Sequence, residues 1–267
     1  MGAVVVKRAV LAGGLGVPYG EVGGAEGTPV VFVHAYVESW RYFEVVLAQL
    51  PDSIHGFAPT QRGHGDADRP EDGYSLGDFA ADIVEFMDAV GIPKAALVGT
   101  SSGGLVSQVV AGTYPDRVSQ LVLISSPASL ADKAVVDGMW AEISAMQDPL
   151  DRGFVADFVR STSPGAMSDD FVERLVEESL KAPARVWKQT LRGLLDYDAR
   201  ADRDRITAPT LLICGDEDLF VRGDQQLLLE AISTARLKLY PGVGHGVHLV
   251  QPGHVVSDIV EFLAESG

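Results

Sequence analysis

The chain has 267 residues, of which 46% are hydrophobic and 22% are charged, the composition of a globular protein long enough to form a large core. Its formal net charge of −16 repels nucleic acid phosphates and anionic membrane surfaces, so we expect neither as a partner. The single cysteine, Cys214, excludes an internal disulfide, and no apolar stretch reaches the ~20 residues of a membrane helix. We therefore expect a soluble, cytoplasmic protein.

Short strands and helices alternate over the first half of the chain. Runs of apolar, β-branched residues predict strands, and apolar residues at helical spacing predict helices. The predicted strands are residues 4–11, 16–22, 30–34, 53–58, 95–99 and 118–124, and the predicted helices are residues 39–50, 75–90 and 102–114. The short links between them predict an α/β fold, with a mostly parallel central sheet and helices on both faces.

The pattern changes between residues 127 and 200, where no strand is predicted. Helices are expected there at residues 134–146, 153–162, 169–180 and 185–195. Strands at 210–214 and 235–240 and helices at 224–232 and 255–263 follow. A structureless connection of ~70 residues would be unusual in a compact domain. We therefore expect one α/β core, residues 1–126 and 201–267, interrupted by a helical cap at residues 127–200.

The segment Gly99-Thr100-Ser101-Ser102-Gly103 fits the pattern G-x-S-x-G directly after a predicted strand. In such a nucleophile elbow the serine occupies a tight strand-to-helix turn, and the positions two residues before and after it must be small. Glycine stands at both positions around Ser101. If Ser102 were the nucleophile, Thr100 would stand where a small residue belongs, so Ser101 is the preferred candidate.

A serine hydroxyl attacks a carbonyl only when a base removes its proton, and that base is usually a histidine oriented by a carboxylate. His245 is the preferred base, because it lies between two glycines in a loop after the last predicted strand. His248, three residues later, is the alternative. No third ligand accompanies these two histidines, so we expect no metal site.

The acid is expected after a late strand, because catalytic groups gather at the carboxyl edge of an open α/β sheet. Gly215-Asp216-Glu217-Asp218 follows the predicted strand at 210–214 directly. Asp218 is the preferred acid, since it lies just beyond the turn and precedes an apolar segment. Asp216 is the second choice.

A developing oxyanion needs two backbone N–H donors. The residue after the nucleophile, Ser102, supplies one at the start of a helix, and the loop after an earlier strand supplies the other. The loop His34-Ala35-Tyr36 holds that position, and Tyr36 is the candidate second donor, with its side chain facing the acyl pocket.

Taken in chain order, these motifs resemble the α/β-hydrolase superfamily, and particularly its small esterases, lactonases and cofactor-free haloperoxidases. The resemblance covers nearly the whole chain and implies a triad of Ser101, Asp218 and His245, a cap over the pocket and no cofactor. Two departures are visible: Ala35 stands where the family usually has glycine, and Gln61 stands near a position where aspartate is common. A serine at the elbow excludes the haloalkane dehalogenases and epoxide hydrolases, which need aspartate there.

We expect the chain to hydrolyse a small, neutral, largely apolar carboxylic ester or lactone through an acyl-enzyme. The alternatives are a perhydrolase, a C–C bond hydrolase using the same triad, or a non-catalytic ligand-binding relative. The expected partner is a small-molecule substrate, and a homo-oligomer stays open. Candidate pocket residues are Tyr36, Trp140, Phe154, Phe158, Trp187 and Leu219, and Met139 and Met146 of the cap are further candidates for its lining. The alternative role of each cap residue is packing between the cap helices.

Overall fold

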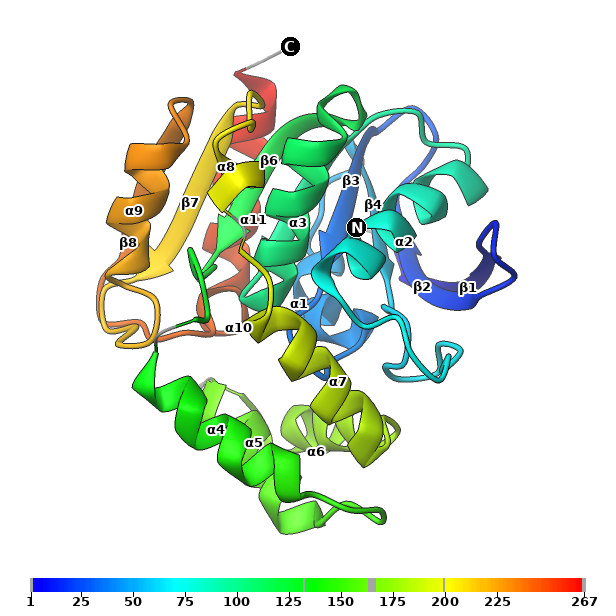
Figure 1. The fold of residues 1–267 in the computed structure, drawn as a ribbon. Coiled ribbons are helices and arrows are strands. Elements are labelled where there is room, and N and C mark those ends of the chain that lie inside the picture. The colour runs from blue at the N-terminus through cyan, green and yellow to red at the C-terminus, as the bar shows by residue number, and fades with distance from the viewer. Residues whose placement is uncertain (1, 132, 163–166, 199, 266–267) are drawn as a thin grey trace.

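The computed structural model describes residues 2–131, 133–162, 167–198 and 200–265. An eight-stranded sheet lies at its centre, in the order β1-β2-β4-β3-β5-β6-β7-β8 (Figure 1). The strands are β1 (Val5–Val10), β2 (Gly16–Val22), β3 (Thr28–Val33), β4 (Ile54–Pro59), β5 (Ala95–Thr100), β6 (Val118–Ile124), β7 (Thr210–Gly215) and β8 (Ala235–Tyr240). Only the pairs β1–β2 and β2–β4 are antiparallel, so the predicted mostly parallel sheet is confirmed.

Helices cover both faces of this sheet, because its central strands are apolar on both faces. Val31 and Leu97 pack into one buried cluster and Phe32 and Val98 into a second, as the alternation of side chains along a strand requires. The first cluster lies under α2 (Leu76–Ala89), α3 (Ser102–Thr113) and α9 (Asp224–Ala231); the second lies under α1 (Glu44–Leu47) and α11 (Pro252–Ala264).

A group of helices lies between β6 and β7 in the chain and sits together at one end of the sheet (Figure 1). We call it the helical insertion; it comprises α4 (Ala134–Ala145), α5 (Arg152–Thr162), α6 (Asp169–Leu180) and α7 (Ala184–Leu195). A short helix, α8 (Arg200–Arg203), follows and packs against α3. All four predicted helices of this segment are present.

Elements of one turn account for most differences from the predicted helices and strands. The helix expected at residues 39–50 is a 3-10 turn, η1 (Trp40–Phe43), followed by the short α1. A further 3-10 turn, η2 (Pro115–Arg117), and the one-turn α10 (Val247–Val250) have no counterpart in the prediction. Segments of three or four residues are too short to show a helical period, so sequence patterns do not reveal them.

Cys214 lies in β7 and is fully buried, as its apolar surroundings in the sequence predict. Burial, with a contribution from the charge of Asp218, raises the pKa of its thiol to about 12. Among the described helices, none has both the length and the apolar composition needed to span a membrane.

Helix α3 crosses β3 so closely that a side chain at the crossing point would not fit. A Cβ atom added to Gly103 would lie 2.2 Å from the carbonyl oxygen of Val33 and 2.4 Å from that of His34. Both obstacles are backbone atoms, which cannot move aside as a flexible side chain can. A glycine is therefore required at this contact.

The variant Gly103→Ala should lose about 3 kcal/mol of stability, because the added methyl group must separate α3 from β3. Gly138→Ala is the matched control: Gly138 lies in α4 with nothing within 4 Å of its added Cβ. Relief of glycine's backbone entropy in a helix should stabilise that variant by about 0.5–1 kcal/mol. Urea unfolding measures both effects, and equal stability of Gly103→Ala and wild type would contradict the close crossing.

Candidate active site

Ser101 joins the end of β5 to the start of α3 in a strained conformation. Its φ of 50° and ψ of −122° are unusual for a residue with a side chain and cost on the order of 1–3 kcal/mol. The Ser101 N–H donates to the carbonyl of Ile124 at 2.9 Å, which holds the turn against β6. A Cβ atom added to Gly99 would lie 2.5 Å from the backbone carbonyl oxygen of Gly103 and 2.4 Å from the Ser107 hydroxyl oxygen, so this glycine is required on steric grounds. The elbow geometry predicted for Ser101 is present.

Asp218 and His245 form a hydrogen-bonded pair beyond the ends of β7 and β8. The His245 Nδ1 atom lies 2.8 Å from Asp218 Oδ2, while the N–H groups of Phe220 and Val221 donate to Asp218 Oδ1 at 3.1 and 3.3 Å. Burial opposes ionisation of Asp218, but the hydrogen bond and charge of His245 and the two N–H donors outweigh it. The net result is a pKa below the ordinary value. An ionised Asp218 requires the proton on Nδ1, which leaves the Nε2 lone pair of a neutral imidazole free to act as a base.

Ser101 and His245 line the same cavity, which has a volume of about 340 Å³ and lies between the sheet and the helical insertion. The remaining lining residues are Ala35, Tyr36, Glu38, Tyr42, Ser102, Leu130, Val135, Val136, Met139, Phe158, Ser161, Leu191, Leu194 and Phe220. Within the part of the chain that the structure describes, no hydrogen bond joins the Ser101 hydroxyl to His245. Catalytic hydrogen bonds are often long without substrate and shorten when it binds, so the absence of this bond is compatible with proton transfer in the substrate complex.

The two predicted oxyanion donors, Tyr36 and Ser102, also line the cavity. Ser102 is the first residue of α3, and the first N–H groups of a helix have no acceptor within it. The Tyr36 ring faces the cavity, but its hydroxyl donates to the carbonyl of Trp187 in α7 at 2.7 Å. Tyr36 therefore also links the loop after β3 to the helical insertion.

A network around His34 holds that loop in place. Gln61 donates its backbone N–H to His34 Nε2 and its side-chain amide to the carbonyl of His34, both at 2.9 Å. The proton of His34 is then on Nδ1, which donates to the carbonyl of Ala35 at 2.8 Å. Burial and the neighbouring His64 lower the pKa of His34 to about 3. Gln61 thus holds the loop in place. It stands near the position at which members of the α/β-hydrolase superfamily are expected to have aspartate.

Residues 28–252 match the model of the α/β hydrolase fold family. The chain belongs to this family. It is 29% identical to the 2-(acetamidomethylene)succinate hydrolase of Mesorhizobium japonicum, over 89% of this chain and 88% of that protein. It is 24% identical to 3-oxoadipate enol-lactonase 2 of Acinetobacter baylyi, over 96% and 97% of the two chains. The crystal structure of a bromoperoxidase from Bacillus anthracis has the same fold, with a TM-score of 0.88 and 22% identity over 97% of this chain and 100% of that one. The family and its relatives support a hydrolase activity for this α/β hydrolase.

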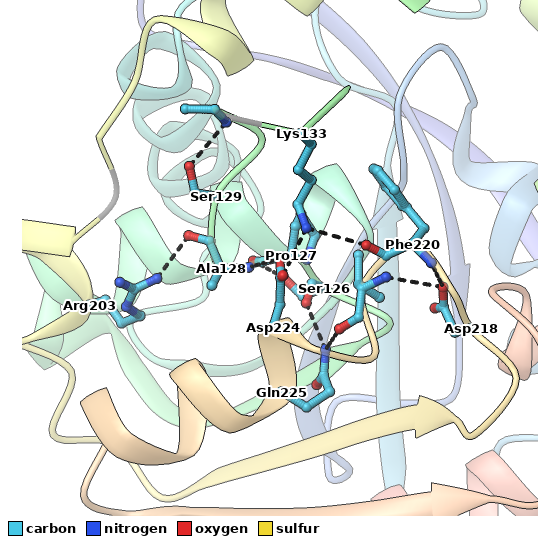
Figure 2. Close-up of polar contacts among 12 residues, drawn as sticks. Ser126, Pro127, Ala128, Ser129, Lys133, Arg203, Asp218, Phe220, Asp224 and Gln225 are labelled. Atoms are coloured by element: carbon cyan, nitrogen blue, oxygen red, sulfur yellow. Dashed lines mark hydrogen bonds and ion pairs between the residues drawn. The ribbon is translucent and has the colours of Figure 1, made fainter. Parts of the chain in front are cut away.

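The segment from Asp218 to Asp224, which we call the acid loop, makes polar contacts with Ala128 and Lys133, which precede the helical insertion in the chain (Figure 2). One oxygen of the Asp224 carboxylate accepts from the Ala128 N–H at 2.8 Å, and the other lies 2.8 Å from Lys133 Nζ. Lys133 also donates to the carbonyl of Phe220 at 3.3 Å, two residues after Asp218. The position of Asp218 therefore depends on contacts made outside the pair with His245.

Among the predicted pocket residues, Tyr36 and Phe158 line the cavity, but Trp140, Phe154, Trp187 and Leu219 do not. Trp187 is fully buried and packs edge-on against the rings of Tyr36 and Phe158, with centroids 5.6 and 5.3 Å apart. Phe154 lies on Trp187 with a centroid separation of 6.2 Å. These two rings form the core of the insertion behind the cavity wall, which corrects the prediction for both.

The predictions that Leu219 and Trp140 line the pocket are wrong for a different reason. The turn after Asp218 directs Phe220 to the cavity and leaves the Leu219 side chain 98% exposed. In α4 it is Met139 that faces the cavity, whereas the Trp140 ring lies under the guanidinium of Arg192, 5.8 Å from its centroid. Met146 also lies outside the lining.

Several lining residues escaped sequence reasoning. Val135 and Val136 lie in α4 beside the expected Met139, and Leu191 and Leu194 form one face of α7. Their helical spacing was a usable signal, because residues three and four apart share a face. A polar residue, Glu38, gave no such signal.

The alternatives considered for base and acid occupy other positions. The Asp216 carboxylate is exposed and accepts from the Gly242 N–H at 2.7 Å. His248 is fully buried outside the cavity lining, against the rings of Tyr42 and Phe43 at centroid distances of 4.8 and 5.2 Å. Both of its ring nitrogens lack a hydrogen-bond partner among the described residues.

Asp218→Asn should lower kcat by about 10³- to 10⁴-fold, because an amide oxygen holds the imidazole less strongly and stabilises its charged form poorly. Asp216→Asn, the matched control at an exposed carboxylate outside the cavity lining, should change kcat by less than about threefold, since only the contact to Gly242 is weakened. Steady-state kinetics with a p-nitrophenyl ester measure both. A larger loss at Asp216 would transfer the role of the acid to that residue.

His248→Leu should fold and should flatten the pH dependence of stability. Burial and the neighbouring His245 lower the pKa of His248 to about 3, against about 6.5 in an unfolded chain. The unfolded chain then takes up a proton that the folded chain does not, so this contribution to stability is complete above about pH 6.5 and is lost as the pH falls toward 3. Between pH 7 and pH 5 the variant should lose about 2 kcal/mol less stability than wild type in urea unfolding. Parallel profiles of stability against pH for the two proteins would show that His248 has the same pKa in the folded and the unfolded chain, which would contradict the prediction.

Proposed function

We propose that this α/β hydrolase cleaves small, neutral, largely apolar carboxylic esters or lactones through an acyl-enzyme. The observation that carries the proposal is the Asp218–His245 pair at 2.8 Å, whose histidine lines the same cavity as the strained Ser101. Most lining side chains are apolar, and none of the described lining residues is lysine or arginine, so an anionic substrate would find no opposite charge.

In the proposed reaction Ser101 Oγ attacks the substrate carbonyl while His245 Nε2 takes the hydroxyl proton. Asp218 holds the imidazole in the required tautomer and stabilises the imidazolium that forms. The N–H groups of Tyr36 and Ser102 stabilise the oxyanion of the tetrahedral intermediate. His245 then protonates the leaving alcohol, and a water molecule activated by the same histidine releases the acid from Ser101.

Residues 127–200 would act as the cap in this reaction. Three of the helices in this segment contribute to the cavity wall, α4 with Met139, α5 with Phe158 and α7 with Leu191. An apolar wall excludes water from the acyl group and strengthens the electrostatic contribution of the oxyanion donors. The shape of this wall sets which acyl groups reach Ser101.

Ser101→Ala should abolish turnover of a panel of p-nitrophenyl esters and γ- and δ-lactones, with a fall in kcat of at least about 10³-fold. Ser144→Ala is the matched control, because Ser144 is an exposed residue of α4 that bonds only to the nearby Ala141 carbonyl. It should retain wild-type rates. Release of p-nitrophenol and of acid measures the two substrate classes. Undiminished hydrolysis by Ser101→Ala would refute the nucleophile, and a wild-type protein that hydrolyses no ester or lactone would refute the proposed reaction.

A further inference from the structure

Glu38 places a carboxyl group in the wall of an otherwise largely apolar cavity. The residue is 2% exposed and belongs to the lining that includes Ser101 and His245. Its Oε2 atom is buried and has no hydrogen-bond partner among the described residues. A buried polar atom without a partner costs about 1–3 kcal/mol, so its presence in a binding cavity calls for an explanation.

The backbone around Glu38 is held in a tight turn. The Glu38 N–H donates to the carbonyl of Ala35 at 3.3 Å, closing a four-residue turn after β3. Val37, the third residue of this turn, has a φ of 57°, a conformation that a β-branched residue rarely adopts. Val37 is fully buried, so packing holds the strained turn in place. The same turn carries Tyr36, the proposed oxyanion donor, and thereby fixes Glu38 relative to the reacting atoms.

Among the described residues, no cation forms an ion pair with the carboxyl group of Glu38. Arg41 Nε and Lys181 Nζ lie 3.4 and 2.7 Å from the carboxylate of Glu178 in α6. Burial, aided by the negative charge of Glu178, raises the pKa of Glu38 to about 8. The group is therefore mostly protonated at neutral pH. A neutral carboxyl offers one O–H donor and one carbonyl acceptor.

We propose that Glu38 is a specificity-determining residue whose carboxyl group binds an uncharged polar group of the substrate, a hydroxyl or a carboxamide. Either group both donates and accepts, and so complements the paired donor and acceptor of the neutral acid. The inference rests on the proposed ester hydrolysis and narrows its substrate class: a largely apolar acyl group that carries one such polar substituent. A site built to bond a polar group discriminates against the analogue that lacks it.

The test compares p-nitrophenyl butyrate with its 2-hydroxy and 3-hydroxy counterparts in wild type, Glu38→Gln and Glu38→Leu. The measured quantity is the ratio of kcat/KM for each hydroxylated ester to that for butyrate. In Glu38→Leu, which keeps the size of the side chain but removes its polar atoms, at least one ratio should fall about five- to tenfold, the value of one hydrogen bond. In Glu38→Gln, which keeps a donor and an acceptor, that ratio should stay within about threefold of wild type.

Asp258→Asn is the matched control, because Asp258 is a buried carboxylate outside the cavity lining that bonds to Lys238 and Tyr240. It should leave the ratios unchanged. Unaltered ratios in Glu38→Leu, or an equal fall in Asp258→Asn, would overturn the role of Glu38 while leaving ester hydrolysis intact.

If wild type hydrolyses none of the three esters, the proposed reaction fails and the esters serve as intact ligands. The role of Glu38 then predicts a larger thermal stabilisation by a hydroxylated ester than by butyrate, in wild type but not in Glu38→Leu. Equal stabilisation of both proteins by all three esters would overturn it.

Discussion

The turn between β5 and α3 is the constraint on which the candidate site depends. Ser101 reaches the cavity because its backbone has a positive φ, and that conformation persists because Gly99 and Gly103 let α3 approach β5 and β3 closely. Two other non-glycine residues of the described chain have positive φ, Val37 and Ser125, and both lie within four residues of the end of a neighbouring strand, β3 or β6. Backbone strain is thus concentrated at the carboxyl edge of the sheet, where the cavity lies.

Several polar contacts connect this edge to the helical insertion, and two groups of them involve segments beside the candidate catalytic residues. Tyr36 bonds to the backbone of α7, and Asp224 bonds to Ala128 and Lys133 at the start of the insertion. Both contacts involve segments that carry candidate catalytic groups, the oxyanion loop in the first case and the acid loop in the second. The insertion therefore contributes to the alignment of these groups as well as to the wall of the cavity.

The candidate catalytic residues and their order along the chain could be predicted from sequence, because their identification depends on local patterns. Glycine spacing identified Ser101, and glycine-flanked or strand-terminal positions identified His245 and Asp218. The pocket could not be predicted in the same way, because a wall depends on which face of a helix turns inward. Trp140 and Met139 are adjacent and equally apolar in pattern, yet only Met139 faces the cavity. The large aromatic residue Trp187 lies in the core of the insertion, because a large ring buries more apolar surface there than in a cavity wall.

Glu38 escaped prediction for a related reason, since nothing in its neighbours distinguishes a buried carboxyl group from an exposed one. Leu219 shows the converse: an apolar residue beside the acid is almost wholly exposed. Charge and hydropathy along a turn describe its average exposure, whereas backbone direction decides each side chain. The prediction was therefore most successful where backbone geometry restricts residue type, as at the elbow.

The buried thiol of Cys214 gives the sheet an internal reporter. Cys214 is the only cysteine of the chain and lies within β7, one residue before the strand ends at Gly215. The turn that carries Asp218 follows directly. A fully buried thiol with a pKa near 12 reacts with alkylating reagents only when its strand becomes accessible to solvent. The rate of alkylation therefore measures how often β7 opens in the native protein, without the introduction of any label.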